Sequence, residues 1–241
     1  MIQCIKLSTS KGDFFGHLYQ GYSQHLFVVI PGLMEPKAGL YYIWQEVARA
    51  FHNKGHSCIL FDLAGQGDST LPFSFDLWFE QRDAIYCFFK NMQIHMISRG
   101  IGSILLSPQQ LNFAIMPSLC DPVSKQLKDV RWKRSLFCKE NLTLEHPHNL
   151  ISIEIKCLHN LGAEAECIGC LEIPAIWIDA LPGLLPKKLP KRTYCYYAEK
   201  GHPLFNKKEE RDNLIKIIDT DFNNMILGRD LKSHKTIQDL T

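Results

Sequence analysis

The chain has 241 residues, of which 46% are hydrophobic and 22% charged, with a formal net charge of +2. This length is enough to bury one large core, so we expect a single domain over residues 1–241. The nearly balanced charge gives no reason to expect a nucleic-acid partner, and no stretch approaches the ~18 apolar residues that cross a bilayer. Residues 1–13 lack a basic segment followed by an apolar run, so we expect no signal peptide and a cytoplasmic protein.

Strand and helix signals alternate along the first half of the chain. Short apolar runs rich in β-branched residues predict buried parallel strands, and apolar residues at helical spacing predict helices between them. The expected elements are a strand at 26–30, a helix at 39–54, a strand at 58–61, a helix at 75–91, and strands at 94–97 and 113–116. This alternation predicts the α/β class, with a mostly parallel sheet covered by helices.

A glycine-rich turn follows the second of these strands. Asp62, Gly65, Gly67 and Ser69 form the pattern D-x-x-G-x-G-x-S, in which glycines permit a tight turn. The pattern and the order of the elements resemble the α/β-hydrolase superfamily. The resemblance implies an α/β-hydrolase fold and, after the strand at 94–97, the strained nucleophile turn G-x-S-x-G.

The chain departs from this family at the nucleophile. The alignment puts Ser98 at the first glycine of the turn, Arg99 next to it, Gly100 at the nucleophile and Gly102 at the last glycine. Because glycine offers no nucleophile, the resemblance implies the fold without the usual serine chemistry. Ser98 or Ser103 could substitute, although we favour local backbone bonding for both hydroxyls.

Other residues near the same sheet edge are candidates for a pocket. The loop after the first strand contains Pro31 and Pro36, which donate no N–H to an oxyanion. Met34 and Glu35 lie in this loop; we expect Glu35 to be a surface carboxylate, and an ion pair with Arg99 is the alternative. Cys120 follows the strand at 113–116, and a small buried apolar residue is the simpler interpretation of it.

A narrower resemblance emerges from four segments together with the serine-poor turn. Residues 31–44, 65–69, 116–127 and 166–175 are similar to hydrolases associated with the exosortase system. This resemblance implies a bacterial protein linked to exopolysaccharide production and protein sorting at the envelope. It implies a hydrolase fold with an unproven reaction, and it supplies no substrate. We expect a small acyl or glycan ligand or an envelope-pathway protein as the partner.

Two alignments compete for the acid and base that follow the nucleophile in this superfamily. In the first, residues 173–178 form a strand and Asp179 lies at the acid position. In the second, which we prefer, Pro174 starts a helix through residue 181 and the next strand is 194–197. In both, His202 is the candidate base, and we favour a solvated loop residue. A charged helix at 206–213 and a last strand at 214–218 should follow.

The second half of the chain and the cysteines give four further expectations: a lid, a frayed tail, reduced thiols and no metal or cofactor. Residues 128–156 interrupt the alternation and are expected to form a small lid, in which Trp132 either lines the pocket or packs internally. The tail at 229–241 is expected to fray. Nine cysteines, an odd number, favour reduced thiols. Cys167 and Cys170 lack the further ligands of a zinc site, so we expect no metal and no cofactor.

Three hypotheses about function follow. The first is a protein that has lost serine chemistry and binds an acyl, glycan or protein partner. The second is an esterase, thioesterase or acyltransferase with a displaced nucleophile. The third is a scaffold with a closed pocket.

Overall fold

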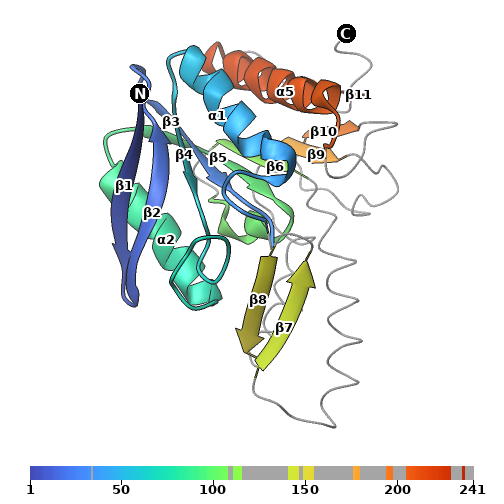
Figure 1. Ribbon diagram of the computed structural model, residues 1–241. Coiled ribbons are helices and arrows are strands. Elements are labelled where there is room, and N and C mark those ends of the chain that lie inside the picture. Colours follow the sequence, from blue (N-terminus) through green and yellow to red (C-terminus); the bar gives the residue numbers. More distant parts are fainter. Residues whose placement is uncertain are drawn as a thin grey trace.

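A nine-stranded sheet forms the centre of the protein (Figure 1), in the order β1-β2-β4-β3-β5-β6-β9-β10-β11. The computed structural model describes residues 1–33, 35–107, 111–115, 141–146, 149–154, 176–179, 194–197, 205–228 and 235–236. The strands of this sheet are β1 (Ile2–Thr9), β2 (Gly12–Tyr19), β3 (His25–Ile30), β4 (Ser57–Phe61), β5 (Gln93–Arg99), β6 (Leu111–Ile115), β9 (Ile176–Asp179), β10 (Tyr194–Tyr197) and β11 (Lys235–Thr236). The helices are α1 (Ile43–Asn53), α2 (Phe75–Phe88) and α5 (Lys208–Ile226), with short 3-10 turns η1 (Leu40–Tyr42) and η2 (Gly100–Leu105).

Most of the sheet is parallel. Strand β3 lies between β4 and β5, so that Val28 is opposite both Ile59 and Met96. Strands β6, β9, β10 and β11 continue the parallel pairing. The hairpin β1–β2 adds two antiparallel strands at the other edge, which the sequence analysis did not predict. The α/β class and the mostly parallel sheet are confirmed.

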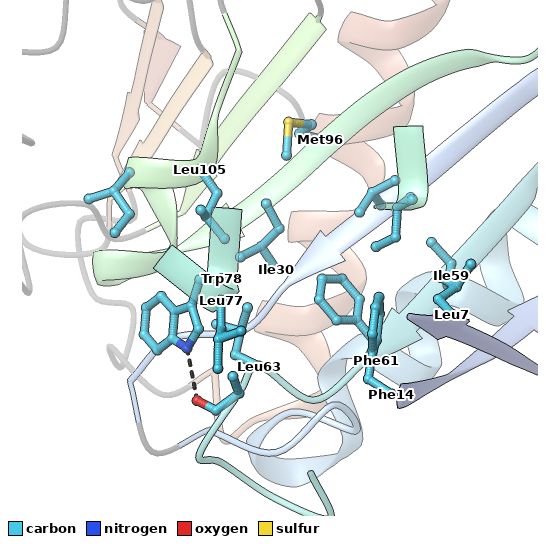
Figure 2. Packing of buried hydrophobic residues seen from close by; sticks show 14 of the residues in the cluster. Leu7, Phe14, Ile30, Ile59, Phe61, Leu63, Leu77, Trp78, Met96 and Leu105 are labelled. Atoms are coloured by element: carbon cyan, nitrogen blue, oxygen red, sulfur yellow. Dashed lines mark hydrogen bonds between the residues drawn. The ribbon is translucent and has the colours of Figure 1, made fainter. Parts of the chain in front are cut away.

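Helices cover both faces of the sheet because side chains alternate along each strand. Leu26, Val28 and Ile30 of β3 belong to the core beneath α2, whereas Phe27 and Val29 belong to the core beneath α1 and α5. Figure 2 shows the first of these cores, in which the indole of Trp78 donates a hydrogen bond to the Ala64 carbonyl at 2.9 Å. This bond ties α2 to the turn after β4 and satisfies the one polar atom that the tryptophan buries.

The predicted helices are present with shifted ends. The helix expected at 39–54 begins at Ile43, because Tyr41 and Tyr42 have φ values of 54° and 61°, which interrupt a right-handed helix. The helix expected at 75–91 ends at Phe88. The predicted strands at 26–30, 58–61, 94–97 and 113–116 correspond to β3, β4, β5 and β6.

Two predictions in the second half of the chain are wrong. The preferred helix from Pro174 to residue 181 is contradicted by β9, which pairs with both β6 and β10; this pairing on two sides outweighs the local preference of proline for a helix start. The strand expected at 214–218 lies inside α5. Its apolar residues continue to Phe222 at helical spacing and face the core, the buried positions being Leu214, Ile217, Ile218 and Phe222.

Two strands lie within the segment for which a lid was expected. Strands β7 (Asn141–His146) and β8 (Asn149–Glu154) form an antiparallel pair that is separate from the nine-stranded sheet. Within the tail that was expected to fray, β11 pairs with β10. Among the residues that the structure describes, no helix combines the length and the apolar character needed to cross a bilayer.

Candidate functional site

The carboxyl ends of β3, β4 and β5 meet at one edge of the sheet, where parallel α/β sheets bind their ligands. Three loops leave this edge: residues 31–42 after β3, residues 62–69 after β4, and the turn from Arg99 into η2 after β5. The contacts between these loops define the candidate site.

A buried ion pair joins the loop after β3 to the end of β5. Nη1 of Arg99 donates to Oε1 of Glu35 at 2.7 Å, and the two residues are only 3% and 4% exposed. The backbone N–H of Gly32 donates to Oε2 of Glu35 at 2.8 Å. The expectation of a surface carboxylate at Glu35 is therefore wrong, and the alternative of an ion pair with Arg99 is what the structure contains. A charge is stable at this depth only when it is paired and hydrogen-bonded in this way.

A second ion pair joins the same loop to the turn after β4. Nζ of Lys37 lies 2.7 Å from Oδ2 of Asp62 and 2.6 Å from Oδ2 of Asp68, and the backbone N–H of Lys37 donates to Oδ1 of Asp62. Burial by itself lowers the pKa of Lys37, but its bonds to Asp62 and Asp68 outweigh burial and raise that pKa above the ordinary lysine value. Two ion pairs, one at Glu35 and one at Lys37, thus hold the loop after β3 to the turns after β5 and β4.

The turn after β5 leads from the strand into η2 through a residue with left-handed backbone angles. Gly100 has a φ of 51°, in the left-handed region that residues with a side chain rarely adopt. Among the described residues, no atom lies within 4 Å of a Cβ atom built on Gly100, whereas one built on Gly102 would lie 2.6 Å from the Pro31 carbonyl oxygen. Gly102 is therefore required for close packing of the turn against β3, whereas the described residues do not crowd Gly100, which is itself buried.

Ser98 and Ser103 lie together inside the protein. Their hydroxyl oxygens are 3.0 Å apart, and Ser98 also donates to the Phe113 carbonyl at 3.4 Å. Both residues are almost completely buried, with exposed fractions of 0% and 1%. Each hydroxyl thus has a polar partner in the core, and neither faces solvent at the carboxyl edge.

The remaining predicted site residues lie outside the described residues: Met34, Cys120, Trp132 and His202. The last residue of β9 is Asp179, one residue beyond the strand end expected in the first of the two alignments. Within the described ranges, no group of three or more His, Cys, Asp or Glu residues is arranged to hold a metal ion, and Cys4, Cys58 and Cys87 are free thiols.

Two residues of the site were not among the sequence candidates. Lys37 stands two positions after Glu35, and its charge could have marked it as a partner for Asp62. Phe205 is buried, and its ring centre lies 5.8 Å from the guanidinium carbon of Arg99. Because Phe205 is 106 positions along the chain from Arg99, no local sequence pattern predicts this contact.

Comparison with known proteins supports the fold. No protein-family model matches the sequence, and no curated protein sequence matches it. Among solved structures, alpha/beta hydrolase domain-containing protein 10 from mouse superposes with a TM-score of 0.70 and 15% identity, covering 92% of this chain and 99% of that one. The thioesterase domain from the curacin biosynthetic pathway gives 0.60 and 13%, covering 90% and 99% of the two chains.

An esterase from Thermogutta terrifontis is similar to the same extent, with a TM-score of 0.60 and 11% identity over 92% of this chain and 98% of that one. The strand order, the helices on both faces and these likenesses agree. The chain has the α/β-hydrolase fold.

Proposed function

We propose that this protein uses the carboxyl edge of its α/β-hydrolase fold to bind an acyl or glycan ligand or a protein partner, without forming a covalent serine intermediate. Gly100 carries this proposal. It follows β5 at the position where the G-x-S-x-G elbow lifts its hydroxyl above the sheet, and it has no side chain to attack a carbonyl. Its φ of 51° is the conformation that an elbow imposes, so the backbone of the turn is retained while its chemistry is absent.

The hydrogen bonds of the loop after β3 support the same proposal. An oxyanion hole needs backbone N–H groups that are free to meet a developing negative charge. In this loop Pro31 has no N–H, and the N–H of Gly32 already donates to Glu35. To bond to the Gly32 N–H, a substrate oxyanion would have to displace a carboxylate that Arg99 also holds, and such an exchange of buried charges is costly.

The buried serines give little support to a displaced nucleophile. A nucleophile needs a general base within hydrogen-bond distance. The partner within 3.0 Å of the Ser98 hydroxyl is the Ser103 hydroxyl, which is not a base at neutral pH. A working site on either serine would require the turn to open.

The biological setting belongs to the proposal as well. The similarity of four segments to exosortase-associated hydrolases suggests a role beside exopolysaccharide production or protein sorting at the envelope, performed from the cytoplasm. In that setting the Glu35–Arg99 pair and the turn at Gly100 would serve recognition in place of turnover.

Hydrolysis of a p-nitrophenyl ester series from acetate to laurate tests the proposal. The wild type is compared with Ser98→Ala, Ser103→Ala and His202→Ala, and thermal shift is recorded with each ester's parent acid to detect binding. We expect every form to hydrolyse at the rate of buffer alone. Turnover by the wild type that is lost in one serine variant would replace the proposal by an esterase with a displaced nucleophile.

A further inference from the structure

A cluster of histidine and phenylalanine rings lies at the amino end of the sheet, opposite the candidate site. We call it the histidine cluster, and its members are His25, Phe27, Phe51, His56, His95 and Phe222. They come from the starts of β3 and β5, from α1, from the residue before β4, and from α5. Neither the motifs of the sequence nor the proposed function uses these residues.

Phe222 of α5 is the centre of the histidine cluster. Its ring centre lies 5.1 Å from that of His25, 5.0 Å from His56 and 4.9 Å from His95, and 4.8 Å from that of Phe27. Phe222 is fully buried. Phe222, in the second half of α5, is therefore held to the sheet by contacts with three imidazole rings and with Phe27.

The hydrogen bonds of the cluster fit uncharged imidazoles. Nδ1 of His25 and Nε2 of His95 are 3.0 Å apart, so only one of these two nitrogens can carry the shared proton. Nδ1 of His95 is buried and has no hydrogen-bond partner among the described residues. Two protonated rings would place N–H against N–H, and a charged His95 would bury an N–H without an acceptor.

The charges around the cluster do not compensate for protonation. The ion pair between Lys54 at the end of α1 and Asp219 of α5, 2.6 Å apart, is close to His56, where Asp219 favours a proton and Lys54 and His25 oppose it. His56 also contacts the hydroxyl of Ser23 at 2.9 Å. Because Asp219 is already paired with Lys54, it neutralises at most part of one added charge.

Burial lowers the pKa of all three histidines below the ordinary value of 6.5, and it lowers the pKa of His95 to about 4, with His25 and His56 adding to the effect. The sign follows from linkage. An opened cluster has ordinary histidines and binds more protons below pH 6.5, so the closed form is favoured above pH 6.5 and weakens as the pH falls towards 4.

The first half of α5 is held by an ion pair with α1. Arg211 pairs with Glu46 of α1 at 2.7 Å, and its Nη1 donates to the carbonyls of Phe205 and Asn206 at 3.2 and 3.0 Å. Figure 1 shows α1 and α5 side by side. The pair between Glu46 and Arg211 joins the first halves of the two helices. The two halves of one helix therefore depend on different chemistry.

We propose that the histidine cluster is an acid-sensitive latch, which holds the second half of α5 on the sheet at neutral pH and releases it on protonation while Arg211 keeps the first half bound. The latch does not depend on the proposed function, because it lies at the other end of the sheet from Gly100. Its release would uncover the rings of Phe27, Phe51 and Phe222.

Hydrogen exchange followed by mass spectrometry at pH 7.5 and pH 5.5 tests the latch on the intact protein. Protection factors, corrected for intrinsic exchange, are compared for peptides covering residues 208–214 and 218–226 of α5. In the wild type we expect protection of 218–226 to fall at least tenfold more than that of 208–214. In His95→Phe, which keeps an aromatic ring and removes the most deeply buried of the three imidazoles, we expect the excess loss of protection in 218–226 to shrink.

A second variant, His25→Gln, keeps the test possible if His95→Phe does not fold. His25→Gln keeps an amide that can bond to His95 and removes one proton-binding ring, so it should shrink the drop in 218–226. Equal loss of protection in both halves of wild-type α5, or an undiminished drop in a folded histidine variant, would overturn the latch.

Discussion

The turns after β4 and β5 lie at the same sheet edge, on either side of the end of β3, yet glycine is favoured in them for different physical reasons. In the turn after β4, a Cβ on Gly65 would lie 2.5 Å from the Cα of Phe73, and one on Gly67 would overlap the Asp62 carboxylate. In the turn after β5, a Cβ on Gly100 would meet no atom of the described residues within 4 Å. Packing thus requires glycine in the first turn, whereas at Gly100 the described residues leave only the backbone angle to favour it.

The same loop is held to both turns by charge, but the two ion pairs differ in depth. Glu35 and Arg99 are buried, with side-chain exposures of 5% and 4%. Lys37 is 16% exposed, and Asp68 is 87% exposed. We therefore expect the turn after β5 to depend more on its ion pair than the turn after β4 does.

The largest expected effect is that of Arg99→Met. It leaves the Glu35 carboxylate buried without its cation and should lower the free energy of unfolding by about 3–5 kcal/mol. Urea-induced unfolding followed by circular dichroism measures the change. The matched change at the other turn, Lys37→Met, should cost about 1–2 kcal/mol, because the backbone N–H groups of Lys37 and Asp68 still bond to Asp62.

A double variant separates charge from shape at this pair. Glu35→Leu combined with Arg99→Met removes both charges, and it should recover much of the stability that Arg99→Met alone loses. If the loss in the free energy of unfolding of the double variant equalled the sum of the losses of the two single variants, the two charges would not be coupled. The difference between the two turns could then not be attributed to their ion pairs.

The next effect in size is that of Gly65→Ala in the turn after β4. The added methyl group collides with the backbone of Phe73 and must also adopt a φ of 78°. We expect a loss of about 2–3 kcal/mol in the free energy of unfolding, measured in the same urea titration.

The smallest effect belongs to Gly100→Ala. The methyl group meets no atom of the described residues, so the expected cost comes from the φ of 51°, at about 1 kcal/mol. A loss equal to that of Gly65→Ala would mean that other contacts crowd Gly100, and the contrast between the two turns would fail.

Local patterns predicted the parts of the molecule that depend on neighbours in sequence. The strands β3 to β6, the helices between them and the turn of Gly65 and Gly67 follow from spacing and composition alone. The helical period of α5 was missed because four of the residues 214–218 are apolar and three of them are isoleucines, over too short a window, and only Phe222 beyond them reveals the period.

Long-range contacts account for the rest. The burial of Glu35 depends on Arg99, 64 positions away, and the contact of Phe205 with Arg99 spans the second half of the chain. The strand at Ile176–Asp179 was expected in one of the two alignments only, and β6 and β10 pair with it on both sides.

The central claim, that the turn after β5 has an elbow's backbone and no nucleophile, is tested most directly by intact-mass spectrometry after incubation with a fluorophosphonate probe. An active serine hydrolase in the same reaction is the positive control. The account predicts that the wild type keeps its mass while the control is labelled. A stoichiometric adduct on the wild type that disappears in Ser98→Ala or Ser103→Ala would contradict it.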